Sequence, residues 1–114
     1  DMETLYDLLH PDCVFISPVV HTPQEGREIT YAYLRAANKA LSEDFQYVRE
    51  VVQDNHAVLE FTVKVDGVFV NGVDIITFEG DQIVELKVMV RPLKAVNAVW
   101  KQMGEMLEQL KAAS

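Results

Sequence analysis

Hydrophobic and polar residues alternate most regularly in the second half of the chain. From Leu59 to Val65 every second residue is hydrophobic, and the residues between are polar. Successive side chains of a strand point to opposite faces, so this pattern predicts a strand with one buried face. The Asp66-Gly67 pair is typical of a two-residue hairpin turn, in which both central residues have positive φ. The pattern and its turns predict four consecutive strands, at Phe45–Val52, His56–Asp66, Val68–Glu79 and Gln82–Arg91.

The first part of the chain shows hydrophobic residues at spacings of three and four, which is typical of amphipathic helices. His10-Pro11 ends the first such segment, because proline does not continue a helix. The pattern predicts, in chain order, a helix at Met2–Leu9, a strand at Asp12–Ser17, a rigid loop at Pro18–Gly26 and a helix at Arg27–Leu41.

A long amphipathic helix is predicted after Pro92, which is suited to the first helical position. Its hydrophobic stripe consists of Leu93, Val96, Trp100, Met103, Leu107 and Leu110. Such a stripe is more often a core or oligomer contact than a ligand site. We interpret Trp100, Met103 and Met106 in that way.

Composition limits the class of protein. The 114 residues are 49% hydrophobic and 25% charged, so we expect residues 1–114 to form one globular domain. The net charge of −8 has the wrong sign for binding nucleic acid or anionic membranes. The chain has no hydrophobic run of membrane-spanning length and does not begin like a signal peptide, which favours a cytoplasmic location. The single cysteine, Cys13, is expected to be a half-buried structural thiol.

The sequence has no cluster of metal-ligating residues, no glycine-rich phosphate loop and no nucleophile in a recognisable activating motif. We therefore expect neither a metal nor a cofactor. Of the three scattered histidines, only His21 lies in a loop at the predicted mouth of the sheet. His21 is a candidate for contact with a ligand.

Asp74 interrupts the hydrophobic face of the third predicted strand of the sheet. By the two-residue period it shares that face with Val70, Ile76 and Phe78. A buried carboxylate is unfavourable unless it is hydrogen-bonded or protonated, and burial raises its pKa. Such a group can donate a hydrogen bond to a ligand or exchange a proton with it. The alternative is a structural Asp74, bonded to Tyr, Arg or backbone N–H groups at a sheet bend marked by Gly72.

The order of elements, with a strand at Cys13–Pro18 and with Val73-Asp74 before Phe78-Glu79-Gly80, resembles the nuclear transport factor 2-like superfamily. Within it, residues 1–92 are most similar to the SnoaL-like and ketosteroid-isomerase branch. The resemblance implies an α+β fold, in which a curved antiparallel sheet wraps around helices as a cystatin-like cone. It also implies an internal apolar pocket, and a homodimer formed through the outer face of the sheet.

The resemblance carries over only some of the family's functional positions. Asp74 matches the carboxylic acid that donates to the substrate oxyanion in ketosteroid isomerases. Ser17 stands where those isomerases have their proton-shuttling Asp, and their oxyanion Tyr belongs to a first helix that would precede residue 1. Val88 is near the position of the water-activating Asp in the similar limonene epoxide hydrolases. Neither reaction can therefore be transferred intact.

These observations favour a protein that binds a small, largely apolar molecule with one oxygen function, and that acts on it as an acid–base isomerase, hydratase or hydrolase. Asp74 is the candidate acid or donor, with Ser17 and His21 as polar partners and Tyr31, Tyr47 and Arg91 as weaker candidates. The predicted pocket walls are Phe15, Phe61, Val63, Val70, Ile76, Leu86 and Val88.

The alternative is a non-catalytic, dimeric binding or protein-interaction domain. It would use the outer sheet face, where Glu85, Lys87, Met89 and Arg91 are mixed in character. The C-terminal helix is predicted to cover the gap left by the missing first helix, in its own subunit or in a dimer partner. A ferredoxin-like or dimeric α+β barrel fold is disfavoured, because strands and helices do not alternate after Leu41.

Overall fold

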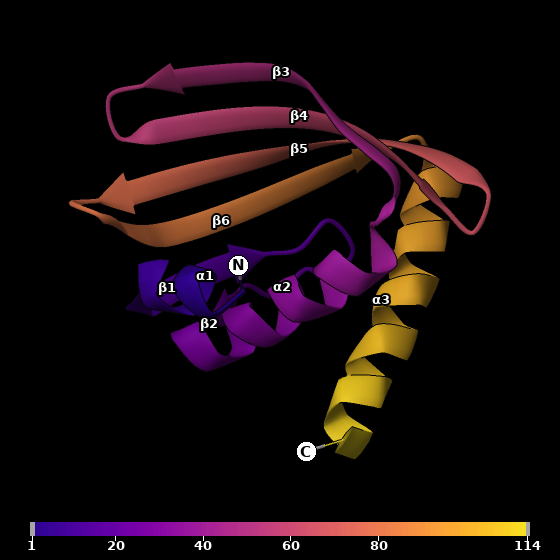
Figure 1. Cartoon of the computed structure of the whole chain (residues 1–114), viewed down its shortest axis with the longest axis horizontal. Coiled ribbons are helices and arrows are strands. Elements are labelled where there is room, and N and C mark those ends of the chain that lie inside the picture. Colours follow the sequence, from indigo (N-terminus) through magenta and orange to yellow (C-terminus); the bar gives the residue numbers. More distant parts are fainter. Residues whose placement is uncertain (1, 114) are drawn as a thin grey trace.

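The computed structural model describes residues 2–113, and the side chains of residues 2–109. Within these residues, six strands form one curved sheet, in the order β2-β1-β6-β5-β4-β3, and three helices accompany it (Figure 1). The elements are α1 (Met2–Leu8), β1 (Leu9–Ile16), β2 (Gln24–Glu25), α2 (Arg27–Ala40), β3 (Glu43–Gln53), β4 (His56–Val65), β5 (Val68–Glu79), β6 (Gln82–Arg91) and α3 (Leu93–Ala113).

The four consecutive strands predicted from alternation are confirmed, with their ends displaced by two residues or fewer. Asp66 and Gly67 have φ values of 52° and 76°, as the hairpin between β4 and β5 requires. All neighbouring strands run antiparallel except β1 and β6, which are parallel. The fold is therefore an α+β, cystatin-like cone whose sheet is mostly, not wholly, antiparallel.

The N-terminal strands differ from the prediction. β1 begins at Leu9, three residues earlier than predicted, although Pro11 lies within it. The pairing of β1 with β6 is irregular between Leu9 and Val14, and within this stretch the N–H of Asp12 donates to Nδ1 of His10 at 3.0 Å. β2 lies in the segment predicted as loop, because Gln24 and Glu25 pair with the edge of β1.

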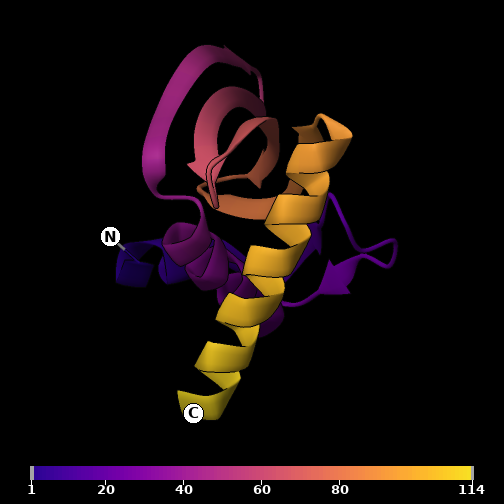
Figure 2. The same cartoon turned by 90° about the vertical axis from the view of Figure 1, so that its right-hand side faces the viewer.

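The helices cover the inner face of the sheet (Figures 1 and 2). α2 packs against β1 and α3, and α3 also packs against β4, β5 and β6. The larger core cluster lies between these helices and the sheet; its buried members are Ala36, Phe61, Val63, Val65, Val70, Ala95, Val99 and Met103. A smaller cluster consists of Leu9, Cys13 and Ile83. Cys13 is fully buried, and thus more deeply than predicted.

The C-terminal helix packs within its own subunit through Ala95, Val99 and Met103, which recur every four residues along one side. Leu93 and Trp100, predicted to share the packed stripe with Met103, are exposed instead. Across residues 2–113, none of the helices combines the length and hydrophobicity needed to cross a membrane.

Candidate functional site

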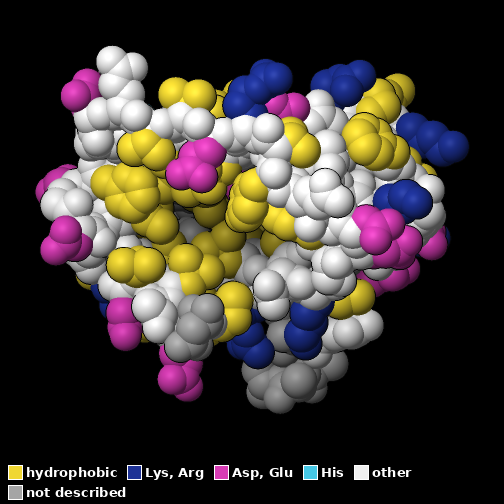
Figure 3. All heavy atoms as spheres, turned by 45° about the horizontal axis from the view of Figure 1, so that its top comes forward, with side chains coloured by type: hydrophobic (Ala, Val, Ile, Leu, Met, Phe, Trp, Pro, Cys, Tyr) yellow, Lys and Arg dark blue, Asp and Glu magenta, His cyan; other side chains and the backbone are white. Residues whose placement is uncertain are grey.

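A cavity of about 440 Å³ lies between the inner face of the sheet and the helices. All three helices and all strands except β2 contribute to its walls, and most of the lining residues are hydrophobic. The surface in Figure 3 is hollowed, with hydrophobic side chains gathered along the walls of the hollow. The size and lining are those of ligand pockets, which are mostly apolar and of about 300–1,000 Å³.

Three aromatic rings build the wall on the side of β3 and β4. Phe45 stacks on Phe61 with 5.2 Å between ring centroids, and Tyr47 meets Phe45 edge to face at 4.9 Å. Phe61 lies directly over Gly72 of β5: a Cβ atom at Gly72 would be 2.9 Å from Cε2 of that ring and closer still to Cζ. Glycine is therefore required at position 72 for the ring to lie flat on the sheet.

Asp74 lies on this inner face, next to Leu59 of β4 and Val88 of β6. Its carboxylate lines the cavity and forms no hydrogen bond or ion pair with any described residue. Burial raises the pKa of Asp74 from 3.8 to about 6. The structural alternative required bonds from Tyr, Arg or backbone N–H groups to Asp74, and none is formed among the residues that the structure describes. The carboxylate thus faces the cavity with no partner among the described side chains and backbone groups.

Ser17 lies on the cavity wall at the end of β1. Its Oγ accepts hydrogen bonds from the backbone N–H groups of Val19 at 3.1 Å and Val20 at 3.3 Å. These bonds occupy the oxygen's lone pairs and leave its own hydrogen free to donate. Ser17 is therefore suited to donate to a ligand, not to remove a proton from one.

Tyr47 was only a weak candidate from sequence, yet it lines the cavity. Partial burial raises the pKa of Tyr47, and the negative charges of Asp74 and Glu50 raise it further. Tyr47 is therefore within electrostatic range of Asp74, with a neutral hydroxyl at physiological pH. Its position opposite Phe61 in the β3–β4 pairing places it on the inner face; the irregular alternation of β3 gave no clear signal of this.

Six of the predicted site residues, the weaker candidate Tyr47 included, line the cavity together with Asp74: Phe15, Ser17, Tyr47, Phe61, Leu86 and Val88. Val63 and Val70 do not, because both are buried in the larger core cluster, together with residues of α2 and α3. Ile76 and Tyr31 pack against the smaller core cluster instead. His21 is exposed and outside the cavity lining, and Arg91 lies on the outer face. The cavity wall thus includes the predicted residues in the middle of the sheet and leaves out those that are buried in the two core clusters.

The helices supply lining residues that the sequence did not assign to the site. Tyr33, Leu34 and Ala37 come from α2, and Val99 and Met103 come from α3. Their helical spacing was visible in the sequence, but only the docking of the helices decides which of them reach the cavity.

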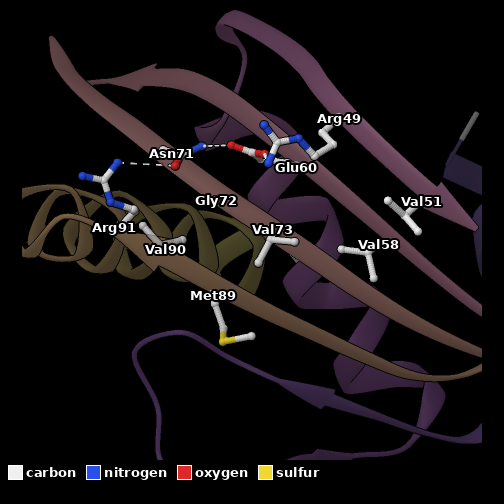
Figure 4. Close-up of a pocket in the computed structure, with 10 residues that line it drawn as sticks. All are labelled: Arg49, Val51, Val58, Glu60, Asn71, Gly72, Val73, Met89, Val90 and Arg91. Carbon is white, nitrogen blue, oxygen red and sulfur yellow. Dashed lines mark hydrogen bonds and ion pairs between the residues drawn. The ribbon is translucent and has the colours of Figure 1, made fainter.

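The outer face of the sheet carries a second hollow, of about 460 Å³ (Figure 4). A row of polar side-chain interactions crosses it from β3 to β6: Arg49 pairs with Glu60 at 3.4 Å, Asn71 donates to Glu60 at 3.0 Å, and Arg91 donates to Asn71 at 3.4 Å. Hydrophobic side chains lie beside this row of polar residues, from Val51, Val58, Val73 and Met89.

Comparison with known proteins places this geometry in a family. The family model described as SnoaL-like domain matches residues 1–86. The chain belongs to the SnoaL-like family. No protein of curated function matches this SnoaL-like chain.

Solved structures agree with this assignment. A steroid delta-isomerase from Pseudomonas aeruginosa is 36% identical, with a TM-score of 0.92, over 98% of this chain and 83% of that one. A protein with a cystatin-like fold from Silicibacter pomeroyi is 32% identical, with a TM-score of 0.85, over 92% and 74%. A protein described as a SnoaL-like polyketide cyclase from a Jannaschia species is 17% identical, with a TM-score of 0.69, over 86% and 77%, and shows the fold alone.

Proposed function

We propose that the cavity binds a small, largely apolar molecule with one oxygen function, and that Asp74 donates a hydrogen bond to it or exchanges a proton with it. The observation that carries this proposal is the carboxylate of Asp74 on the wall of an open, hydrophobic cavity of about 440 Å³, where no described residue forms a hydrogen bond or ion pair with it. The steroid delta-isomerase among its relatives supports a ligand of this kind.

A pKa of about 6 lets Asp74 serve in either protonation state near neutral pH. The protonated carboxyl donates to a ligand oxygen, and the carboxylate removes a proton from carbon or water. An isomerisation that moves a double bond needs a proton taken from one carbon and returned to another. A single carboxylate performs both steps in turn, while Ser17 and Tyr47 offer hydroxyl groups to the ligand oxygen.

The proposal is tested with a steroid ketone whose double bond is unconjugated, followed by the ultraviolet absorbance of the conjugated product. We expect the rate to rise as pH passes about 6, and Asp74→Asn to lower kcat/KM by roughly 100-fold or more. Binding of the product ketone is measured in parallel by calorimetry. Asp81→Asn is the matched control, because Asp81 is exposed in the turn between β5 and β6.

Equal binding and equal turnover in the wild-type protein and Asp74→Asn would contradict the proposal. If binding depends on Asp74 but the protein shows no turnover, the binding part of the proposal is supported and the isomerase part is contradicted.

A second candidate function is a non-catalytic dimeric binding domain. Met89 and Val51 are 49% and 53% exposed on the outer sheet face, beside Arg49, Glu60 and Arg91. Across a two-fold axis, the hydrophobic groups of this face can contact those of the other copy. Each charged group can pair with an oppositely charged group of the other copy. We expect Met89→Glu to weaken such a dimer in sedimentation equilibrium. An unchanged association would contradict it, and the open cavity favours the first function over this one.

A further inference from the structure

The side of α3 that faces away from the core carries hydrophobic surface which the fold does not use. Leu93 is 75% exposed and Trp100 is 63% exposed. Gly104 lies one turn after Trp100, and nothing lies within 4 Å of the position that a Cβ atom would take there. A hollow runs along this side, and it is lined by Trp100, Lys101, Gly104, Glu105, Glu108 and Gln109.

These residues form one stripe with charges along one flank. At 3.6 residues per turn, Leu93, Trp100 and Gly104 fall within about 40° of one another around the helix axis. Lys94 and Lys101 lie on the flank in the first half of the stripe, and Glu105 and Glu108 lie on the same flank in the second half. The flank is therefore basic toward one end and acidic toward the other.

Such a flank complements itself when two helices run antiparallel. Antiparallel packing about a two-fold axis brings the same flanks together with their ends exchanged, so each basic half meets an acidic half. A two-fold axis at the height of residue 102 along the helix places Trp100 opposite Gly104 of the other copy. The charge pairs between the two copies fit an axis at almost the same height. Pairing of Lys101 with Glu105, or of Lys94 with Glu108, needs an axis within one residue of position 102. The steric and the charge patterns thus indicate one alignment.

We infer that α3 pairs antiparallel with α3 of a second copy of this chain, with the Trp100 ring seated over Gly104 of that copy. The C-terminal half of α3 extends beyond α2 and the sheet in both ribbon views, which leaves this side accessible (Figures 1 and 2). The contact is separate from the outer sheet face. It also lies on the helix that supplies Val99 and Met103 to the cavity, so pairing holds one cavity wall in place.

A single helix pair buries less surface than the ~800 Å² per partner of a standard interface, so we expect association in the micromolar range or weaker. Trp100 is the only tryptophan in the sequence. Its fluorescence therefore reports on this contact alone. We expect the emission of the full chain to shift to shorter wavelength with rising concentration, with the same midpoint as dimerisation in sedimentation equilibrium.

Three single variants and one double variant test the alignment. Trp100→Ala should weaken association by about tenfold or more, because a central tryptophan contributes strongly to an interface. Lys101→Glu and Glu105→Lys should each weaken it, and the double variant should restore it, since reversal of both charges recreates the pairs between copies. Met89→Glu on the outer sheet face is the control, and it should leave the concentration-dependent emission unchanged.

Several results would overturn the inference. These are a monomer at all concentrations, a dimer without a change in Trp100 emission, and a double charge variant that associates as weakly as the single ones. Emission already shifted to short wavelength in the dilute monomer would also overturn it, because another part of the same chain would then cover Trp100.

Discussion

The carboxylate of Asp74 is the residue-scale feature on which the proposed function depends. Burial raises its pKa from 3.8 to about 6, so the folded protein holds this proton more tightly than the unfolded chain. The resulting stabilisation is fully present below about pH 4 and is lost as pH rises through about 6. At about 1.4 kcal/mol per pKa unit, burial of the charged form destabilises the fold by ~3 kcal/mol at neutral pH.

Asp74→Asn should therefore stabilise the protein at pH 7.5 while it weakens ligand binding. We expect the free energy of unfolding to rise by about 1–2 kcal/mol, less than the full burial energy because the buried amide also lacks partners. Urea unfolding between pH 4 and pH 8 measures this. The free energy of unfolding of the wild-type protein should fall between pH 4 and pH 6, and most of this fall should be absent in Asp74→Asn. Asp81→Asn should keep it. A loss of stability in Asp74→Asn at pH 7.5 would show that the carboxylate has a structural role.

At the scale of single elements, Gly72 decides how β4 and β5 shape the cavity. An alanine there would overlap the Phe61 ring, which is also held by Phe45 on its other side. We expect Gly72→Ala to lower the free energy of unfolding by about 1–3 kcal/mol. We also expect weaker binding of a fluorescent apolar probe, since the displaced ring enters the cavity.

Phe61→Leu provides the control for this effect, because it removes the ring atoms that the new methyl group would meet. In a double-mutant cycle followed by urea unfolding, Gly72→Ala should be less destabilising in the Phe61→Leu background. Additive effects of the two substitutions would show that the overlap is not the cause.

The two sides of α3 make different contributions to stability. Met103 is buried against the sheet and the cavity, whereas Trp100 is largely exposed. We expect Met103→Ala to lower the free energy of unfolding by about 2–4 kcal/mol. Trp100→Ala should change it by less than about 0.5 kcal/mol in dilute protein. Equal effects of the two substitutions in thermal unfolding would contradict this division of the helix.

At the scale of the whole molecule, the cone keeps a cavity open beside a close-packed core. The neighbouring α2 residues Ala36 and Ala37 mark the boundary between them: Ala36 is fully buried in the core, and Ala37 lines the cavity. Open cavities of this kind lower stability relative to a filled core, so function and stability are in competition here.

Ala37→Leu should fill part of the cavity, raise the free energy of unfolding by about 0.5–1 kcal/mol and weaken binding of the apolar probe. Ala36→Leu is the matched control on the same helix, and it should destabilise the protein by about 1–3 kcal/mol, because the core there has no space for the larger side chain. Urea unfolding and a fluorescence titration measure both effects. A probe that binds Ala37→Leu as tightly as the wild-type protein would place the binding site elsewhere.

The sequence by itself determined the helices, the four-stranded meander and the presence of a carboxylate on the inner face. These features follow from local periodicity and turn chemistry, which act between residues close in the chain. The pairing of β2 with β1 and the parallel contact of β1 with β6 join distant segments, so no local pattern encodes them.

Tertiary structure alone decided which inner-face residues form the site. Phe61 and Val63 share one face of β4, yet only Phe61 reaches the cavity, because Val63 is buried in the core cluster that the helices form with the sheet. The same packing left Asp74 without a partner among the described residues and turned Trp100 away from the core, since each outcome depends on how the curved sheet and the helices meet in space.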